Sequence, residues 1–300
     1  ILIKGIDAPP AGDEGGYLKL GDYLLGKAPE SFFLFRAPLA GFIFTPFFLI
    51  FGSSSQLARV VNVVISSIFA PLIYCILKKK FKKDKIPFIL SIFWVFYPPS
   101  IFYSSMITSE NLAGLMILLL IQIIQKNEKK VIIKNFVFLG FICSLISLTR
   151  SSYYYLPFFM LLYFIYKYRL KLNMIKAYLL FITSFYLTLS PLIIYNYKTF
   201  GAFLPSEPRL GYGLYLCNND LNNPEIKKGG YYRDEYLKQR GSNYENMKEM
   251  YADDKALKEK TLKYMNENKL QLIIPMINRY INIWSFRPNP IKNNYTNNDL

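Results

Sequence analysis

Residues that could do chemistry gather near the start of the chain, in the stretch DAPPAGDEGGYLKLGDYLLG (7–26). Three carboxylates, Asp7, Asp13 and Glu14, lie there just upstream of long apolar sequence. The chain has no histidine, so general acid–base chemistry falls to carboxylates of this kind. Without histidine or a CxxC pair, a zinc site of the usual Cys/His kind is excluded. Any metal cofactor would be an oxygen-ligated divalent cation, Mg²⁺ or Mn²⁺.

The composition is that of a membrane protein. Of the 300 residues, 52% are hydrophobic and only 19% are charged, which is too apolar for a water-soluble domain of this size. The formal net charge is +16, but the lysines stand in short clusters between apolar runs and not along one polar face. We therefore expect the chain to interact with the lipid bilayer and not with nucleic acid.

Six stretches have the length and hydropathy expected of membrane-spanning helices: 57–77, 86–103, 107–125, 131–148, 152–166 and 176–196. Basic residues fall in alternate loops between them, KKKFKKDK (78–85), KNEKK (126–130) and YKYRLKLNMIK (166–176). The positive-inside rule places those loops in the cytoplasm. The sequence thus predicts an all-α polytopic protein of the plasma membrane, a transmembrane helix bundle with extracytoplasmic loops and interfacial helices.

The parts on either side of the bundle are expected outside the cell. Residues 1–56 would form a first outer loop, 57–196 the six-span bundle, and 197–300 an outer loop with a helical tail. The segment 38–52 is apolar but short and contains a proline, which predicts a re-entrant or interfacial helix. The segment 243–270 is charged and free of Pro and Gly, which predicts a soluble helix that leads back toward the membrane through QLIIPMINRYINIWSF.

Two charged residues stand alone at the ends of predicted spans. Glu110 is the single charge in YPPSIFYSSMITSENLAGLMILLL and lies where a span begins. It is either an acid favoured by the helix dipole, after Ser109 as a cap, or a functional carboxylate. Arg150, in SLISLTRSSYYYLPFF, is either a snorkelling arginine or an anion ligand. The planar fork of donors on arginine favours phosphate as that anion.

Under this topology the polar residues of interest share the outer side of the membrane. They are Asp7, Asp13, Glu14, Arg36, Glu110, Arg150 and the LCNND loop (216–220). Loop residues are often polar simply because loops meet water, but polar residues at membrane depth are costly and tend to mark function. Their convergence predicts an active site on the extracytoplasmic side.

The same residues carry a family resemblance. The stretch DEGGYLKLGDYLLG, followed by FRAPLAGFIFTPFFLIFGSSSQLARVVNVV, resembles the start of the GT-C glycosyltransferases related to protein O-mannosyltransferases and lipid A aminoarabinose transferases. Three further segments follow in the family order, namely FYPPSIFYSSMITSENLAGLMILLL, GFICSLISLTRSSYYYLPF and YNYKTFGAFLPSEPRLGYGLYLCNND. Together the four cover roughly residues 5–225.

The resemblance implies an inverting enzyme that moves a sugar from a polyprenyl-phosphate donor to a lipid, glycan or protein acceptor. The acceptor hydroxyl must lose a proton as it attacks the anomeric carbon, and a carboxylate can take it. The leaving phosphate gains negative charge, which fixed cations stabilise. The implied roles are catalytic for Asp13 first, then Glu14 and Glu110; phosphate or donor binding for Arg36, Arg150 and Arg209; and sugar or acceptor binding for Tyr17, Asn218 and Asn219.

The chain also departs from the family pattern. The usual first span ahead of the acidic loop and the later spans after the tail are missing, and there is no starting Met and no signal peptide. We therefore expect a fragment of a longer protein. Cys217 stands where the family often has Gly, and Asp7 is expected to be an ordinary loop residue. The tyrosines of SSYYYLPFF are expected in an interfacial aromatic belt, with sugar stacking as the alternative.

Two other classes of function fit a polytopic chain with outward charges. A transporter or lipid flippase would carry charges near mid-span and paired halves with broken helices, whereas these charges lie at span ends and no repeat is found. A non-catalytic membrane component of cell-envelope glycan assembly would not need the acids. The glycosyltransferase is the hypothesis that the residues favour.

Overall fold

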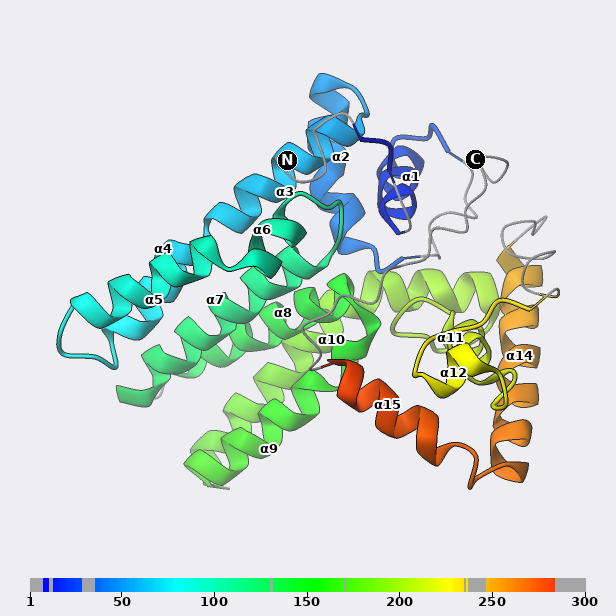
Figure 1. Ribbon diagram of the computed structural model, residues 1–300. Coiled ribbons are helices and arrows are strands. Elements are labelled where there is room, and N and C mark those ends of the chain that lie inside the picture. The colour runs from blue at the N-terminus through cyan, green and yellow to red at the C-terminus, as the bar shows by residue number, and fades with distance from the viewer. Residues whose placement is uncertain are drawn as a thin grey trace. The chain divides into compact units, whose positions relative to one another are not determined.

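The computed structural model describes residues 8–10, 13–28, 36–129, 132–169, 171–234, 236 and 247–283. Every regular element within these ranges is a helix (Figure 1). The chain divides into two units, residues 1–208 and residues 209–300. Asp7 lies outside the described residues, and the three-part division expected from the sequence stays a prediction.

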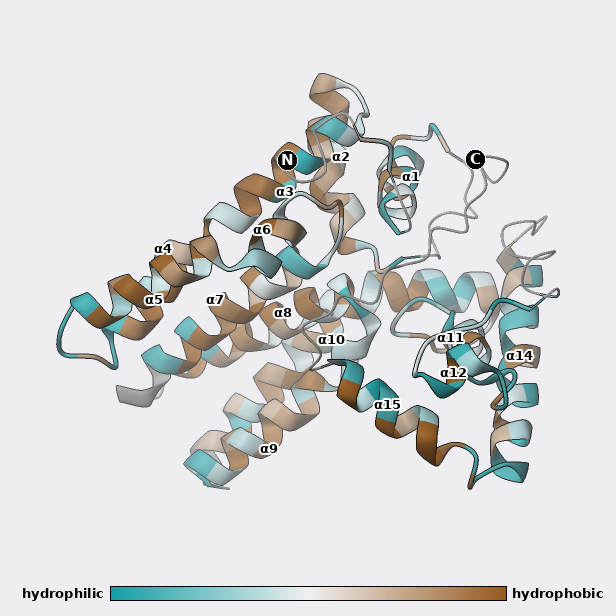
Figure 2. Ribbon diagram, viewed as in Figure 1, coloured by the Kyte–Doolittle hydropathy of each residue, from teal (hydrophilic) through white to brown (hydrophobic). Residues whose placement is uncertain are grey.

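Unit 1 is a set of mostly apolar helices, coloured brown along much of their length in Figure 2. In chain order they are α1 (Glu14–Leu24), α2 (Leu39–Phe51), α3 (Ser55–Ser67), α4 (Phe69–Lys78), α5 (Lys85–Phe96), α6 (Pro98–Ser104), α7 (Glu110–Lys129), α8 (Ile133–Thr149), the 3-10 helix η2 (Ser151–Tyr155), α9 (Leu156–Tyr168) and α10 (Leu172–Phe200).

The membrane character of these helices is confirmed. Within the described residues, two helices are long and apolar enough to cross a bilayer, Ser55–Lys78 (α3 and α4) and Met174–Phe200 in α10. A third is added if α5 and α6, which are bent by 57° at Tyr97, form one span. All six predicted spans fall on helices, so the prediction of an all-α membrane protein holds. The number of spans and their orientation stay predictions.

The break between α5 and α6 has a cause in the sequence. Pro98 and Pro99 follow Tyr97, which adopts an extended conformation with φ −69° and ψ 116°. A residue before proline avoids the helical region, and proline is accepted in the first turn of a helix, so one helix ends and another begins here. As a result, the chain changes direction between α5 and α6, shortly before the loop of residues 105–109.

The core of unit 1 is an aromatic layer between α8, α9 and α10. Phe136, Phe164 and Phe181 are fully buried there, with the Phe136 and Phe164 rings 5.0 Å apart in an edge-to-face arrangement. Such pairs contribute about 0.5–1.5 kcal/mol beyond the area they bury. Gly140 lets α8 approach α10 closely, because a Cβ there would lie 2.2 Å from the Phe181 carbonyl oxygen. Arg150, at the end of α8, therefore follows a helix that is held in place by close packing.

The predicted apolar segment 38–52 forms α2, and glycines fix its contact with α1. A Cβ on Gly41 would lie 2.4 Å from Leu20 Cγ, and a Cβ on Gly21 would lie 2.7 Å from the Phe48 ring. Each helix thus presents a glycine to a bulky side chain of the other. The solvent side of α2 remains apolar, as expected of an interfacial helix, although its place at a membrane stays a prediction.

Unit 2 contains α11 (Leu210–Asn218), α12 (Pro224–Lys227), α14 (Met247–Glu267) and α15 (Ile273–Ile283). The helix predicted over 243–270 is confirmed as α14, whose polar residues colour it largely teal in Figure 2. The prediction of an LCNND loop is wrong for residues 216–218, which form the last turn of α11. The reason is that α11 packs on α14 through buried Tyr215 and Leu257.

The start of α11 is fixed by a carboxylate. Asp254, on α14, accepts hydrogen bonds from the backbone N–H groups of Gly211 at 3.0 Å and Tyr212 at 2.7 Å. These are donors that a helix N-terminus leaves unsatisfied, and a carboxylate is favoured there by the helix dipole. Burial raises the pKa of Asp254 above its ordinary value. In unit 2 the N-terminus of α11 is thus bonded to a side chain of α14.

Candidate active site

Asp13 and Arg36 form an ion pair at the beginning of α1. Asp13 occupies the N-cap position but makes no capping bond with its side chain, which instead accepts a hydrogen bond from the Arg36 guanidinium. The Asp13 side chain is 68% exposed and that of Arg36 is 25% exposed. The pair therefore presents an accessible carboxylate whose position is set by a more buried arginine.

Tyr17 lies one turn further along α1 and joins it to the start of α7. Its hydroxyl donates a hydrogen bond to Ser109 Oγ at 2.9 Å, and the Arg36 guanidinium lies 5.8 Å from its ring centroid. Burial raises the pKa of Tyr17 above its ordinary value of 10.0. The phenol therefore stays protonated and donates this bond at neutral pH.

Glu110 and Arg150 form a second ion pair, in which Arg150 Nη1 lies 2.5 Å from Glu110 Oε1. Glu110 is the first residue of α7, where the helix dipole favours an acid, as the sequence suggested. Arg150 ends α8 in an extended conformation, which lets it reach across to α7. The Arg150 side chain is 44% exposed and that of Glu110 is 39% exposed. Both groups remain accessible to a ligand.

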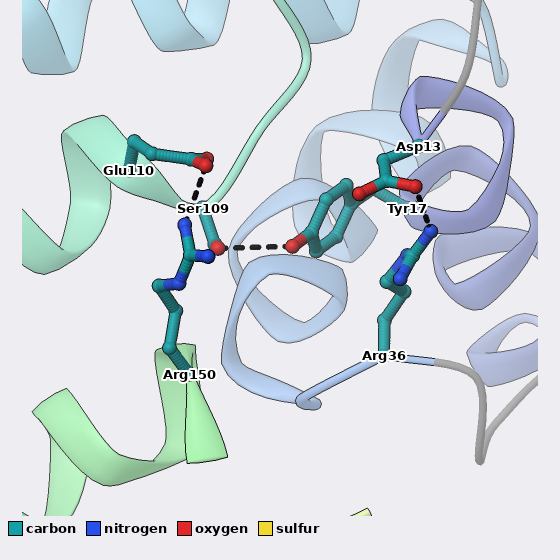
Figure 3. Close-up of polar contacts among 6 residues, drawn as sticks. All are labelled: Asp13, Tyr17, Arg36, Ser109, Glu110 and Arg150. Atoms are coloured by element: carbon teal, nitrogen blue, oxygen red, sulfur yellow. Dashed lines mark hydrogen bonds and ion pairs between the residues drawn. The ribbon is translucent and has the colours of Figure 1, made fainter. Parts of the chain in front are cut away.

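The two ion pairs lie on either side of Tyr17. Figure 3 shows Asp13 with Arg36 on one side of the phenol and Glu110 with Arg150 on the other. Tyr17 follows Asp13 by one turn of α1 and bonds to Ser109, the residue before Glu110, so it connects the two pairs. Six residues from four separate parts of the chain are therefore brought together, and five of them are among the predicted site residues.

Glu14, the neighbour of Asp13, points inward. Its side chain is 0% exposed, and so is that of Arg59 on α3, whose Nη2 lies 3.6 Å from Glu14 Oε2. The other oxygen, Oε1, accepts a hydrogen bond from the backbone N–H of Ile107 at 3.0 Å. A buried carboxylate needs such partners, because taking its charge out of water is costly. Glu14 thus ties together α1, α3 and the loop before α7.

The loop of residues 105–109 is held by other buried polar side chains as well. Asn62, one turn after Arg59 on α3, donates through Nδ2 to the carbonyl oxygens of Met106 and Tyr103. Asn111 also donates to the Tyr103 carbonyl, at 2.9 Å. These bonds add side-chain donors to carbonyls at the end of α6 and in the irregular segment that follows it. Because Ser109 and Glu110 follow directly, the loop sets the position of one side of the site.

Sequence reasoning missed Arg59 and Asn62. Both fall inside the first predicted span, in SQLARVVNVVISS, at positions i and i+3. Residues with that spacing share one helix face. A charged residue within an apolar span is costly and calls for a partner, so the signal that singled out Glu110 and Arg150 was present for Arg59 too.

The other predicted site residues lie in unit 2. Arg209 stands before α11, with its guanidinium 4.6 Å from the Tyr212 ring centroid. Asn218 is buried, its Nδ2 donating to the Leu214 carbonyl and its Oδ1 accepting from Arg279. Asn219 donates through Nδ2 to the Tyr232 carbonyl. Their roles in sugar or phosphate binding stay proposals.

The acids of the site do not form a ligand set for a metal. Among the residues that the structure describes, no three His, Cys, Asp or Glu side chains are grouped so as to hold an ion. Asp13 and Glu110 each face an arginine and not another carboxylate. The described residues therefore offer no ligand set made of protein side chains alone for the Mg²⁺ or Mn²⁺ that the sequence left open.

Comparison with known proteins gives the family. No curated protein and no solved structure matches the chain. A family model described as dolichyl-phosphate-mannose-protein mannosyltransferase matches residues 35–195, more than half of the chain. The match includes Arg36, Glu110 and Arg150 and begins after Asp13. The chain therefore belongs to the dolichyl-phosphate-mannose-protein mannosyltransferase family, and it is a membrane glycosyltransferase of the GT-C type.

Proposed function

We propose that this glycosyltransferase moves a sugar from a polyprenyl-phosphate donor to an acceptor hydroxyl at the outer face of the membrane, with inversion at the anomeric carbon. The observation that carries the proposal is the exposed carboxylate of Asp13 beside a second accessible pair, Glu110 and Arg150. The arrangement offers a proton acceptor and cations on the two sides of one phenol. A single displacement with a phosphate leaving group needs both.

In the proposed step, the acceptor oxygen attacks the anomeric carbon while its proton passes to the Asp13 carboxylate. The bond between that carbon and the phosphate oxygen breaks, and its electron pair leaves with the polyprenyl phosphate. Inversion follows because the attack and the departure occur on opposite faces of the carbon. The exposure of Asp13 supports its role as base, and the burial of Glu14 against Arg59 supports a structural role for that second candidate.

The arginines are proposed to stabilise the leaving phosphate. Arg150 is the first candidate, because its side chain is nearly half exposed and its guanidinium can make paired bonds to phosphate oxygens. Arg36 keeps Asp13 in position and is the second candidate. Glu110 orients Arg150 through their ion pair. Tyr17, Arg209, Asn218 and Asn219 remain proposed contacts to the donor or acceptor.

The test compares two aspartates that both sit in exposed ion pairs. The full chain is reconstituted in liposomes with a polyprenyl-phosphate sugar and an acceptor, and sugar transfer is followed for wild type and Asp13→Asn. Loss of a general base lowers the rate by about 10²–10⁴-fold. The control is Asp84→Asn, because Asp84 lies 3.4 Å from Lys78 in a pair of similar exposure. Equal rates for Asp13→Asn and the control would remove Asp13 from the base role.

A further inference from the structure

Helix α15 of unit 2 turns its polar side toward the rest of the unit and its apolar side outward, the reverse of what is usual for a helix that faces water. Its inward side is polar: Asn278 and Asn282 donate hydrogen bonds to the carbonyls of Lys227 and Lys228, the latter at 2.7 Å. Arg279 donates to Asn218 Oδ1 at 3.2 Å and to the Cys217 carbonyl. These bonds fasten α15 to the rest of unit 2 by one side.

The outward side of α15 is apolar. Seven apolar side chains in and just before the helix are between 50% and 83% exposed: Leu270, Ile273, Ile274, Met276, Ile277, Tyr280 and Ile281. At about 100° per residue, they occupy one continuous arc of about 160°, and Asn278, Arg279 and Asn282 lie outside that arc. Figure 2 shows brown and teal residues alternating along α15 accordingly. A face of this size is normally covered.

The loop that supports α15 is shaped to keep this orientation. Gly229 has φ +83°, and a Cβ there would lie 2.7 Å from the backbone nitrogen of Arg279. Only glycine lets the backbone adopt that conformation and approach the helix so closely. The polar side of α15 is therefore held inward by backbone contact as well as by hydrogen bonds, and the helix cannot simply roll to bury its apolar side.

We propose that the apolar face of α15 lies in the headgroup region of the membrane, so that the helix docks unit 2 on the bilayer surface. Three lysines beside the helix, Lys227, Lys228 and Lys269, are exposed. Lys228 lies 3.8 Å from Glu225, and the three together favour anionic lipid headgroups. Helices that lie in a membrane interface combine an apolar face with cations on the polar side, and here Lys227 and Lys228 adjoin the polar side of α15.

The connection between the units makes this occupant reachable. Unit 2 begins at Arg209, and only eight residues (201–208) separate it from Phe200, where a helix long and apolar enough to cross the membrane ends. Eight residues reach at most about 30 Å even when fully extended. The start of unit 2 is thus kept near the bilayer by the chain itself. The inference goes beyond the proposed function and does not depend on it.

The test measures the surroundings of α15 in the full chain, in lipid nanodiscs that contain anionic lipid and no polyprenyl donor. Cys75 and Cys217 are replaced by serine and buried Cys143 is left in place. A nitroxide label is then attached at Ile277→Cys or, as a matched control on the exposed side of α14, at Ala256→Cys. The readout is the collision rate of the label with oxygen, which concentrates in lipid, relative to that with a water-soluble nickel chelate.

We expect a severalfold higher ratio of oxygen to nickel collisions at position 277 than at position 256. Equal ratios at the two positions would show that α15 faces water and would overturn the proposal. Low collision rates with both reagents at 277 would also overturn it, because the helix would then be covered by protein, either a second copy or another segment. Because no donor is present, a high ratio reports the bilayer and not a bound polyprenyl chain.

Discussion

Asp13 and Glu14 are adjacent acids with opposite surroundings. Asp13 is largely exposed and pairs with Arg36 at the edge of unit 1, whereas Glu14 is fully buried with Arg59 and the Ile107 N–H. The pairs have the same chemistry, but only the outer one can meet a ligand without rearrangement of the helices. The inner one joins α1, α3 and the loop of residues 105–109.

The difference indicates a division of work between an exposed and a buried layer. The exposed layer consists of Asp13 and Arg36 with Glu110 and Arg150, and we expect its variants to change turnover far more than stability. The buried layer consists of Glu14, Arg59 and Asn62, and we expect its variants to change stability first.

The largest effect is expected at the buried pair. Glu14→Gln leaves Arg59 buried without its charged partner, and breaking a buried pair in this way costs about 3–5 kcal/mol. The measurement is thermal unfolding of the full chain in nanodiscs. The exposed-pair variant Asp13→Asn should unfold within about 1 kcal/mol of wild type. Similar losses for the two variants would end the distinction between the layers.

A double variant sharpens that result. Glu14→Gln combined with Arg59→Met removes both charges, so much of the stability lost in Glu14→Gln should return. A double variant as unstable as the sum of the single variants would show that the two residues act independently of each other. The same thermal unfolding measurement decides between these outcomes.

The next effect is expected at Arg150. Arg150→Gln removes the cation proposed to stabilise the leaving phosphate, which should lower kcat by about 10²–10³-fold. Stability should change by less than about 1 kcal/mol, because the Arg150–Glu110 pair is partly exposed and screened by solvent. Turnover with a polyprenyl-phosphate sugar is the measurement. Lys78→Gln, from the exposed Lys78–Asp84 pair, is the control and should retain wild-type turnover.

A smaller effect is expected at Asn62. Asn62→Ala removes two hydrogen bonds, to the Met106 and Tyr103 carbonyls, although Asn111 still donates to the Tyr103 carbonyl. At about 0.5–1.5 kcal/mol for each bond, the free energy of unfolding should fall by about 1–3 kcal/mol. Turnover should fall only to the extent that movement of the loop of residues 105–109 displaces Glu110. If Asn62→Ala unfolded like wild type while losing turnover completely, Asn62 would belong to the exposed layer instead.

The smallest effect is expected at Tyr17. Tyr17→Phe removes one hydrogen bond to Ser109, which contributes about 0.5–1.5 kcal/mol. Because the pKa of Tyr17 is raised by burial, its contribution to stability is present below pH 10 and is lost as pH rises through that raised value. Unfolding of wild type and Tyr17→Phe, followed from pH 7 to pH 11, should therefore differ by a constant amount up to pH 10 and converge above it. A difference that grew with pH would contradict this account.

The sequence predicted much of the fold because the apolar runs are long. Helices at 57–77 and 176–196 and the charged helix α14 follow from hydropathy and from the absence of helix breakers in 243–270. The break at Tyr97 was not predicted, because the hydropathy of 86–103 indicates one continuous span. The sequence also could not predict that residues 216–218 are helical, because that turn is stabilised by packing of α11 on α14, which lies about 40 residues away in the chain.

For the candidate site, the sequence identified single residues but not their pairing. Asp13, Arg36, Glu110 and Arg150 were all selected, yet nothing local indicates which arginine meets which acid. Asp13 is exposed and Glu14 is buried because of the way α1 is oriented against its neighbours. Contacts of Leu20 and Gly21 with α2 help to set that orientation. The spacing of the acids in the sequence does not reveal such contacts.

The two glycines at the contact of α1 and α2 affect how freely this part of the sequence can vary. Alanine substitution removes atoms at most positions, but at Gly21 and Gly41 it adds a methyl group where Phe48 and Leu20 already lie. Either change forces the neighbouring side chain or α1 itself to shift, and Asp13 moves with α1 when the helix shifts. In a scan of all single substitutions, these glycines should therefore tolerate substitution poorly, although neither has any chemical role in transfer.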